Sequence, residues 1–207
     1  MNEDPDSSLP ASPPAVADGG AESEPPGIGV AFRISDEGWQ DLAASLELLA
    51  EESARKAVIA ALGKLGLALP SGGLEVGLLF AGDEEIQGLN REYRGIDKAT
   101  NVLSFPAIAS REEMDWELNA AVDGRPLIIG DVALARETIL SEADGASKDR
   151  IGHLQHLIVH GVLHLFGFDH DSPAEADIME TLEVKILAEL GVADPYRRSG
   201  AAEALDD

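Results

Sequence analysis

Strand-like runs of apolar residues occur in four segments of the chain. Residues 29–35 alternate between apolar and other side chains, residues 74–81 are largely apolar, and residues 101–106 form a short run that ends at a proline. Residues 126–135 are apolar almost without interruption, which is typical of a strand buried on both faces of a sheet. We therefore expect four strands, with residues 126–135 in a central position.

Apolar residues at helical spacing separate these strands. A long stretch from Asp36, the expected N-cap, to about Leu67 has one apolar stripe. The members of this stripe are Leu42, Leu46, Leu49, Ala50 and Ala57. Asp83 is expected to cap a second helix that ends near Tyr93.

The second half of the chain adds two predicted helices, at about residues 147–166 and 173–190. Residues 107–125 have no clear period and are expected to form a long loop. Strands with helices placed between and after them indicate a single layered domain of the α/β or α+β class.

The two ends of the chain differ in composition from the rest. Residues 1–27 contain six acidic residues, six prolines and no lysine or arginine. Such a segment cannot bury enough apolar surface to offset the entropy lost on ordering, so we expect it to be disordered. Residues 199–207 are expected to form a second, short acidic tail. This division leaves residues 28–198 as one domain, which is long enough to form a hydrophobic core.

The formal net charge of the chain is −24, and without the two tails 30 acidic residues remain against 15 basic ones, or −15. A general nucleic-acid binder needs a basic face to displace counterions from phosphates, so no DNA partner is expected. The chain has no cysteine, no apolar run of membrane-spanning length and no basic segment followed by an apolar one at its start. We therefore expect a cytoplasmic protein without a membrane partner.

All five histidines lie within residues 153–170. His160 and His164 are four residues apart, so on a helix they project within about 40° of each other, one turn apart. Both imidazoles can then reach one metal ion at roughly 2.0–2.1 Å. Gly167 can end the helix in the left-handed conformation and bring His170 back to the same ion. We therefore predict a metal site of His160, His164 and His170 that holds one ion per chain.

Zinc is the ion that three neutral nitrogen ligands and one open position favour. The spacing of the histidines is that of the metzincin proteases, except that Gly161 stands where those proteases have glutamate. Peptide hydrolysis needs a carboxylate beside the attacking water, so this glycine argues against proteolysis. A zinc site can also polarise a phosphoryl oxygen, and phosphate chemistry then needs cationic partners.

Other residues in the same segment have less specific expectations. His156 lies one turn before His160 on the same face and is expected to be structural or to support a ligand, and His153 is expected at the surface. The two aromatic residues beside Gly167, Phe166 and Phe168, are expected to line the core or a pocket. The two acidic residues beside His170, Asp169 and Asp171, are expected either to orient a ring nitrogen or to solvate the turn.

A cluster of cations supplies candidate phosphate contacts in this acidic chain. Arg91, Arg94 and Lys98 lie at the end of the second predicted helix and in the loop after it. Arg91 suits a helix C-terminus, where a cation complements the helix dipole. Arg94 stands directly before a glycine, where a turn would project its side chain from the helix. Ser104 and Asp131 are secondary candidates on neighbouring strands, each expected to be structural.

Three motifs, in the same order, resemble the YbeY family of bacterial endoribonucleases: YRGIDKATNVLSFP, IIGDVALA and HGVLHLFGFDH, the last followed by a helix with Met179 and Glu183. The resemblance runs from about residue 74 to residue 196. It implies an α+β fold with a small mixed sheet. It also implies a zinc-dependent ribonuclease that prefers single strands and acts in ribosomal RNA maturation, at the small-subunit 3′ end, and in ribosome quality control.

The resemblance implies roles for particular residues and partners. His160, His164 and His170 fall on the metal ligands, with His160 also counted among the catalytic residues, and Arg94 falls on the catalytic arginine. The implied partners are single-stranded ribosomal RNA and ribosomal particles or assembly factors. The chain departs from the family pattern at two positions: Ala99 stands where the family usually has proline, and Phe168 stands where tyrosine is common.

The residues leave two other classes open. One is a ribosome-assembly factor without catalysis, whose zinc is structural and therefore closed by four protein ligands. The other is a metallohydrolase of amide or peptide bonds, with a carboxylate from Asp131 or Asp169 as base. For phosphate chemistry, attack by water and attack by the ribose 2′-hydroxyl both fit the motif.

Overall fold

A computed structural model describes residues 27–42, 45–120 and 124–197, so the expected tails lie outside the described residues apart from Gly27. In chain order the elements are β1 (Ile28–Ile34), the 3-10 helix η1 (Glu37–Asp41), α1 (Leu46–Leu65), β2 (Leu74–Ala81), α2 (Asp83–Arg94), β3 (Val102–Pro106), α3 (Arg111–Ala120), β4 (Leu127–Ala135), α4 (Arg136–Gly145), α5 (Arg150–Leu165) and α6 (Pro173–Glu189). None of the described helices is both long and apolar enough to cross a membrane.

The strands form one mixed sheet in the order β1-β2-β4-β3. β1, β2 and β4 run parallel to one another, whereas β3 is antiparallel to β4 and lies at the edge. This arrangement confirms the expected α+β fold with a small mixed sheet of four strands. β4 lies inside the sheet between β2 and β3, as its apolar run predicted.

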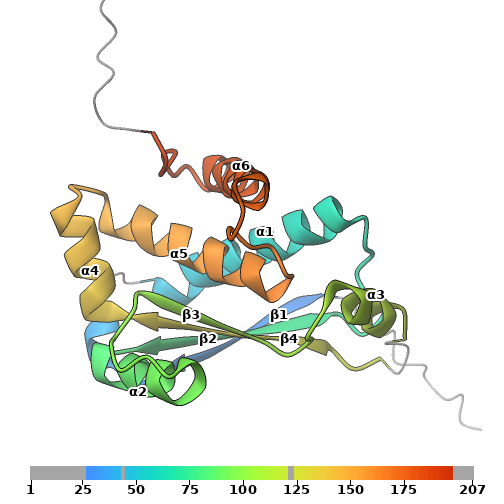
Figure 1. Ribbon diagram of the computed structural model, residues 1–207, viewed down its shortest axis with the longest axis horizontal. Coiled ribbons are helices and arrows are strands. Elements are labelled where there is room, and N and C mark those ends of the chain that lie inside the picture. Colours follow the sequence, from blue (N-terminus) through green and yellow to red (C-terminus); the bar gives the residue numbers. More distant parts are fainter. Residues whose placement is uncertain (1–26, 43–44, 121–123, 198–207) are drawn as a thin grey trace, which may run out of the picture.

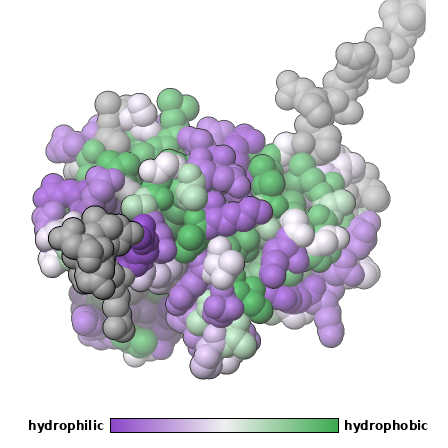
Figure 2. Space-filling model, turned by 90° about the horizontal axis from the view of Figure 1, so that it is seen from above, coloured by the Kyte–Doolittle hydropathy of each residue, from purple (hydrophilic) through white to green (hydrophobic). Residues whose placement is uncertain are grey.

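Helices cover the two faces of the sheet unequally (Figure 1). α1 and α5 pack on one face, with α6 beyond them, whereas α2 lies on the other face. The larger core lies under α1 and α5 and includes Phe80, Val132 and Leu134. A smaller cluster under α2 includes Ile86 and Leu103. Seen from the α6 side, hydrophilic and hydrophobic patches alternate over the surface (Figure 2).

The first predicted helix begins later than expected. Asp36 caps η1 rather than a long helix, and α1 begins only at Leu46. Contacts with distant segments hold this short turn in place. Trp39 is fully buried and its indole N–H donates to the Ala81 carbonyl at 3.0 Å, and the Asp36 carboxylate accepts from Arg136 at 2.7 Å. The apolar spacing of the segment alone cannot show partners that lie 42 and 100 residues away.

Two helices lie where none was expected. The predicted loop at residues 107–125 contains α3, and α4 follows β4 directly. Each of these helices buries only one pair of residues, one turn apart: Met114 and Leu118 in α3, and Ile139 and Ala143 in α4. One buried pair is too short a pattern to establish a helical period, so both helices escaped prediction.

The remaining helices begin within three residues of the predicted starts, although the capping residue of α2 differs from the expected one. Gly82 is the N-cap of α2, and Asp83 is its first residue rather than its cap. The Asp83 carboxylate instead accepts hydrogen bonds from the backbone and hydroxyl of Thr138, at 3.0 and 2.8 Å. Asp149 caps α5, and Ser172 begins α6 with a capping box.

Candidate metal centre

Gly161 sets how closely α5 approaches the sheet. A Cβ atom at this position would lie 2.5 Å from a Val132 methyl group and 3.2 Å from one of Val102. The Ser104 hydroxyl also donates to the Gly161 carbonyl at 2.9 Å, which is a structural contact. Position 161 therefore faces β3 and β4, and a glutamate side chain does not fit there.

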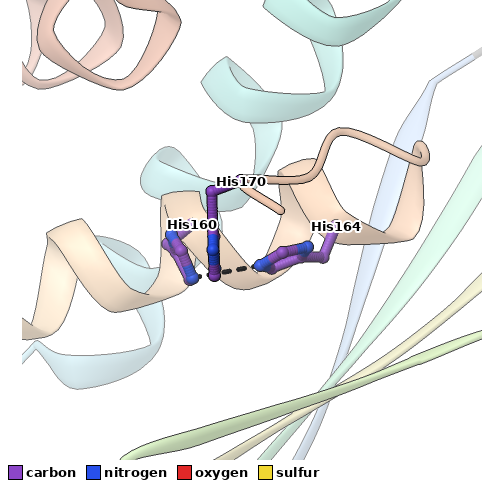
Figure 3. A group of neighbouring side chains, drawn as sticks. All are labelled: His160, His164 and His170. Carbon is purple, nitrogen blue, oxygen red and sulfur yellow. Dashed lines mark hydrogen bonds between the residues drawn. The ribbon is translucent and has the colours of Figure 1, made fainter. Parts of the chain in front are cut away.

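The structure brings the three predicted ligands together. The Nε2 atoms of His160 and His164 lie 3.1 Å apart, and one ring nitrogen from each of His160, His164 and His170 lies within 4.8 Å of the others. Gly167 has a φ of 72°, the left-handed conformation that reverses the chain after α5. Figure 3 shows the rings converging, two from α5 and His170 from the loop that follows it.

The three histidines fit a metal ion by donor type and spacing. Two nitrogens bound to one tetrahedral ion lie about 3.3 Å apart, close to the spacing of the two α5 rings. Burial, and then the charge of His160, lower the pKa of His164 to about 4. His164 is therefore neutral at physiological pH and can offer a lone pair. Among the described residues two groups could hold an ion here: these three histidines, and a second group in which His160 is joined by His156 and Glu183. In the second group one ring nitrogen of each histidine already donates to the Glu183 carboxylate, so the three histidines are the better site for an ion.

Glu183 orients the first of these ligands. Its side chain is fully buried, and its carboxylate accepts from His160 Nδ1 at 2.8 Å and from His156 Nε2 at 2.9 Å. Burial raises the pKa of Glu183, but the hydrogen bonds from His156 and His160 outweigh it and hold this pKa at about 2. With Nδ1 as the donor, Nε2 of His160 carries the lone pair that a metal requires.

Glu183 joins further groups to the centre. The Tyr196 hydroxyl donates to the same carboxylate. His156 therefore supports the site through Glu183, in line with the supporting role expected for it. His153 does not lie at the surface as expected. It is buried, with 9% of its area exposed, and its Nε2 lies 3.0 Å from a Glu142 oxygen.

Comparison with known proteins identifies the family. Residues 40–191 match the family model described as Endoribonuclease YbeY. The chain belongs to this family. A relative with that name from Rhodospirillum rubrum is 45% identical over 159 residues, which is 76% of each chain. Another from Azorhizobium caulinodans is 46% identical over 163 residues, or 79% of this chain and 92% of the relative. A third, from Allorhizobium ampelinum, is 44% identical over 171 residues, or 82% and 95%. The resemblance of the three motifs to the YbeY family is confirmed.

Arg94, the arginine that the YbeY resemblance points to, does not contact the histidines. It is the last residue of α2, which lies on the face of the sheet opposite α5 (Figure 1). Its side chain is exposed and has no hydrogen bond or ion pair with any residue that the structure describes. Arg91 is held by Asp97 at 3.2 Å. A direct role of Arg94 beside the metal stays a prediction.

A different cation, Arg111, lies beside the metal loop. Its guanidinium stands 5.0 Å from the centre of the Phe168 ring, and its side chain passes Gly167. Phe168 is buried, as expected, and Asp169 accepts from the backbone N–H of His170 at 2.8 Å, which stabilises the turn. The sequence does not point to Arg111, because the single buried pair of α3 gives that segment no clear helical period.

Proposed function

We propose that this protein is a cytoplasmic, zinc-dependent endoribonuclease that cuts single-stranded ribosomal RNA, including the 3′ end of small-subunit RNA. The observation that carries the proposal is the convergence of three histidine donors in a chain that belongs to the endoribonuclease YbeY family. His160 and His164 are half-buried and His170 is exposed, so substrate can reach the ligand atoms. A structural zinc site would be closed by a fourth protein ligand.

The histidines, Glu183 and the arginines have separate roles in this function. When bound, zinc would supply charge that polarises a phosphodiester oxygen and acidifies water. His160, His164 and His170 would hold it, and Glu183 keeps the His160 ring in one tautomer. Arg94 and Arg111 offer guanidinium groups that match the geometry of phosphate, because each carries a planar fork of donors. The attacking group is water or the ribose 2′-hydroxyl.

Cleavage assays on two kinds of substrate test this function. Metal-loaded protein is incubated with labelled single-stranded RNA and, separately, with casein. We expect internal cuts in the RNA and none in casein. The His164→Ala variant should keep its fold, release the metal as measured by elemental analysis, and leave the RNA intact. Intact RNA with the metal-loaded wild type, or full zinc in the variant, would refute the proposal. A 2′,3′-cyclic phosphate product would identify the 2′-hydroxyl as the attacking group.

Presentation of the RNA by a ribosomal particle or assembly factor belongs to the same proposal. The core of the chain has a charge of −15, so its long-range field repels RNA and slows encounter. A partner that holds the RNA removes this barrier. Cleavage of RNA within ribosomal particles should therefore be faster and confined to fewer positions than cleavage of the same RNA free in solution.

A further inference from the structure

A groove of about 460 Å³ lies on the sheet face opposite the three histidines. β1, β2, β4 and β3 form its floor, and α2 forms one wall. Most of its lining is apolar. The residues that matter below are Arg33, Gly77, Tyr93, Phe105 and Asp131. Tyr93, Phe105 and Asp131 come from the first two motifs of the YbeY resemblance, and the metal centre uses none of them.

Asp131 is placed in this groove by two glycines. Gly130 has a φ of 144°, and the pairing of β2 with β4 shifts register there, so a bulge turns the next side chain outward. Gly77 stands opposite Asp131, and a Cβ at position 77 would lie 2.0 Å from the Asp131 Oδ1 atom. The carboxylate is exposed and has no hydrogen bond or ion pair with any described residue. An acceptor without a partner thus stands in an apolar groove.

Tyr93 gives the groove an aromatic wall. The residue is 64% exposed, and its ring packs edge-on against Phe105 with centroids 5.2 Å apart. Edge-on packing holds one side of the ring and leaves the remainder to solvent. An exposed, positioned aromatic ring is a surface on which a nucleobase stacks. The side chain of Arg33 is 74% exposed and lies 3.8 Å from Glu85, a loose pair that leaves its charge available to a phosphate.

We propose that this groove binds one unpaired base of an RNA strand, with the ring against Tyr93 and the Watson–Crick edge on Asp131. A carboxylate accepts from amino and ring N–H groups. Guanine offers two such donors side by side and is therefore preferred, whereas uracil places carbonyl oxygens on both sides of its one donor. The preference rests on the proposed function, which makes RNA the substrate.

The position of the groove suits a strand that also reaches the metal. β3 is the edge strand, with α5 on one of its faces and the groove on the other. Arg94 follows Tyr93 at the end of α2, on the groove's side of the sheet. One RNA strand that crosses β3 would place a base in the groove, a phosphate near Arg94 and a further phosphodiester at the histidines. A basic side chain could also pair with Asp131 and stack on Tyr93, but the cations beside the groove, Arg33 and Arg94, favour an anionic strand over a basic segment.

Binding of short RNAs that resist cleavage tests the proposal. The probes are 2′-O-methyl heptamers of uridine whose central base is guanine, inosine or uracil, measured by fluorescence anisotropy with the metal-loaded full chain. The methyl group blocks attack by the 2′-hydroxyl, and gel analysis of each probe after the titration checks that water has not cut it. Inosine lacks only the 2-amino group of guanine. We expect the guanine probe to bind about tenfold or more tightly than the uracil probe, with inosine between them. Equal affinities for the three probes would overturn the proposal.

Variants assign the preference to the groove. Asp131→Asn should bring the three probes to within about twofold of one another, since the amide loses one acceptor and the charge. Tyr93→Leu keeps an apolar contact with Phe105 and should weaken all three probes by about tenfold. Asp177→Asn, on the exposed side of α6, and Trp116→Ala, an exposed aromatic on α3, are matched controls that should change nothing. An unchanged guanine preference in Asp131→Asn refutes the assignment.

Two outcomes separate this proposal from the proposed function. If the protein binds guanine through Asp131 but leaves cleavable RNA intact, the groove proposal stands and the proposed function fails. If the protein cuts RNA but shows no base preference that depends on Asp131, the proposed function stands and the groove proposal fails. If Asp131→Asn abolishes binding of an arginine-rich peptide and leaves the RNA probes unaffected, the groove binds a basic protein segment instead.

Discussion

Position 161 shows how a missing side chain can serve packing rather than chemistry. Replacing Gly161 with alanine should lower the free energy of unfolding by about 1–3 kcal/mol, because the added methyl group meets Val132 inside the core. Gly63→Ala is the matched control, since a Cβ added at that site on α1 would meet no other segment of the chain, and it should add up to about 1 kcal/mol through helix propensity. Urea unfolding measures both. Equal effects of the two substitutions would contradict the packing account.

Arg94 carries a prediction about rate rather than stability. Arg94→Ala should lower RNA cleavage by about 10²–10³-fold, by analogy with the loss of one transition-state donor, while zinc content stays unchanged. Arg94→Lys should recover little, because a lysine lacks the planar fork of donors. Single-turnover cleavage and elemental analysis are the measurements. Arg55→Ala is the control, because Arg55 is paired with Glu51 on α1 and lies outside the candidate phosphate contacts. Cleavage at the wild-type rate in Arg94→Ala would remove this residue from the mechanism.

At the scale of elements, α6 stabilises a site that α5 and its following loop build. The link is Glu183, whose carboxylate reaches His160 and His156 on α5 and accepts from Tyr196 after α6. This arrangement explains why an acidic residue stands in the buried face of α6. The pairing of α5 with α6 is therefore part of the metal centre as well as of the core.

Glu183→Gln should weaken zinc binding by about 10–100-fold, as expected when a carboxylate that orients a metal-binding histidine is lost. The substitution keeps the side-chain volume but removes the charge that fixes the His160 tautomer. Competition with a chelator of known affinity gives the metal dissociation constant without any activity assay. Glu180→Gln, at an exposed position of the same helix, should leave zinc affinity unchanged. The idea fails if both variants bind zinc as the wild type does.

At the scale of the whole molecule, the stability of the metal-free protein should fall in acid. The pKa of His164 is lowered from 6.5 to about 4, so between these values the unfolded chain binds more protons and stability decreases as pH drops. The pKa of Glu183 is lowered from 4.5 to about 2, so its stabilising contribution is present above pH 4.5 and is lost toward pH 2. Urea unfolding of chelator-treated protein across this range measures the trend.

A His164→Gln variant is the control for the upper part of this pH range. Glutamine does not titrate, so the variant should lose less stability between pH 6.5 and pH 4 than the wild type does. Below pH 4.5 both proteins should weaken together, because Glu183 is present in each. Parallel curves over the whole range would mean that His164 is not the group responsible.

The charge of the molecule predicts weak binding of free RNA. At −15 for the core, only a few cations such as Arg91, Arg94 and Lys98 can contact phosphates. When the logarithm of the binding constant is plotted against the logarithm of the salt concentration, three such contacts on a single strand predict a slope near −2, since each contributes roughly −0.7. Anisotropy titrations of one short RNA from low to physiological salt measure the slope. Submicromolar binding with a steep slope would instead reveal a basic groove.

What the sequence alone determined is what depends on near neighbours in the chain. The four-residue spacing of His160 and His164 follows from the helical repeat, and the turn that returns His170 follows from the left-handed freedom of Gly167. The strands were visible because an apolar run needs no partner to be recognised. Membership of the family followed from motifs that are contiguous in sequence.

Only the tertiary structure decided which distant groups meet. Gly161 is explained by Val132 across the helix–sheet contact, and Glu183 acquires its role because α6 lies against α5. Arg94 and Asp131 lie on the far side of the sheet from the three histidines, although the family resemblance makes Arg94 catalytic. Their placement depends on strand order and on a single bulge in β4, and these are set by long-range pairing and packing that no local pattern encodes.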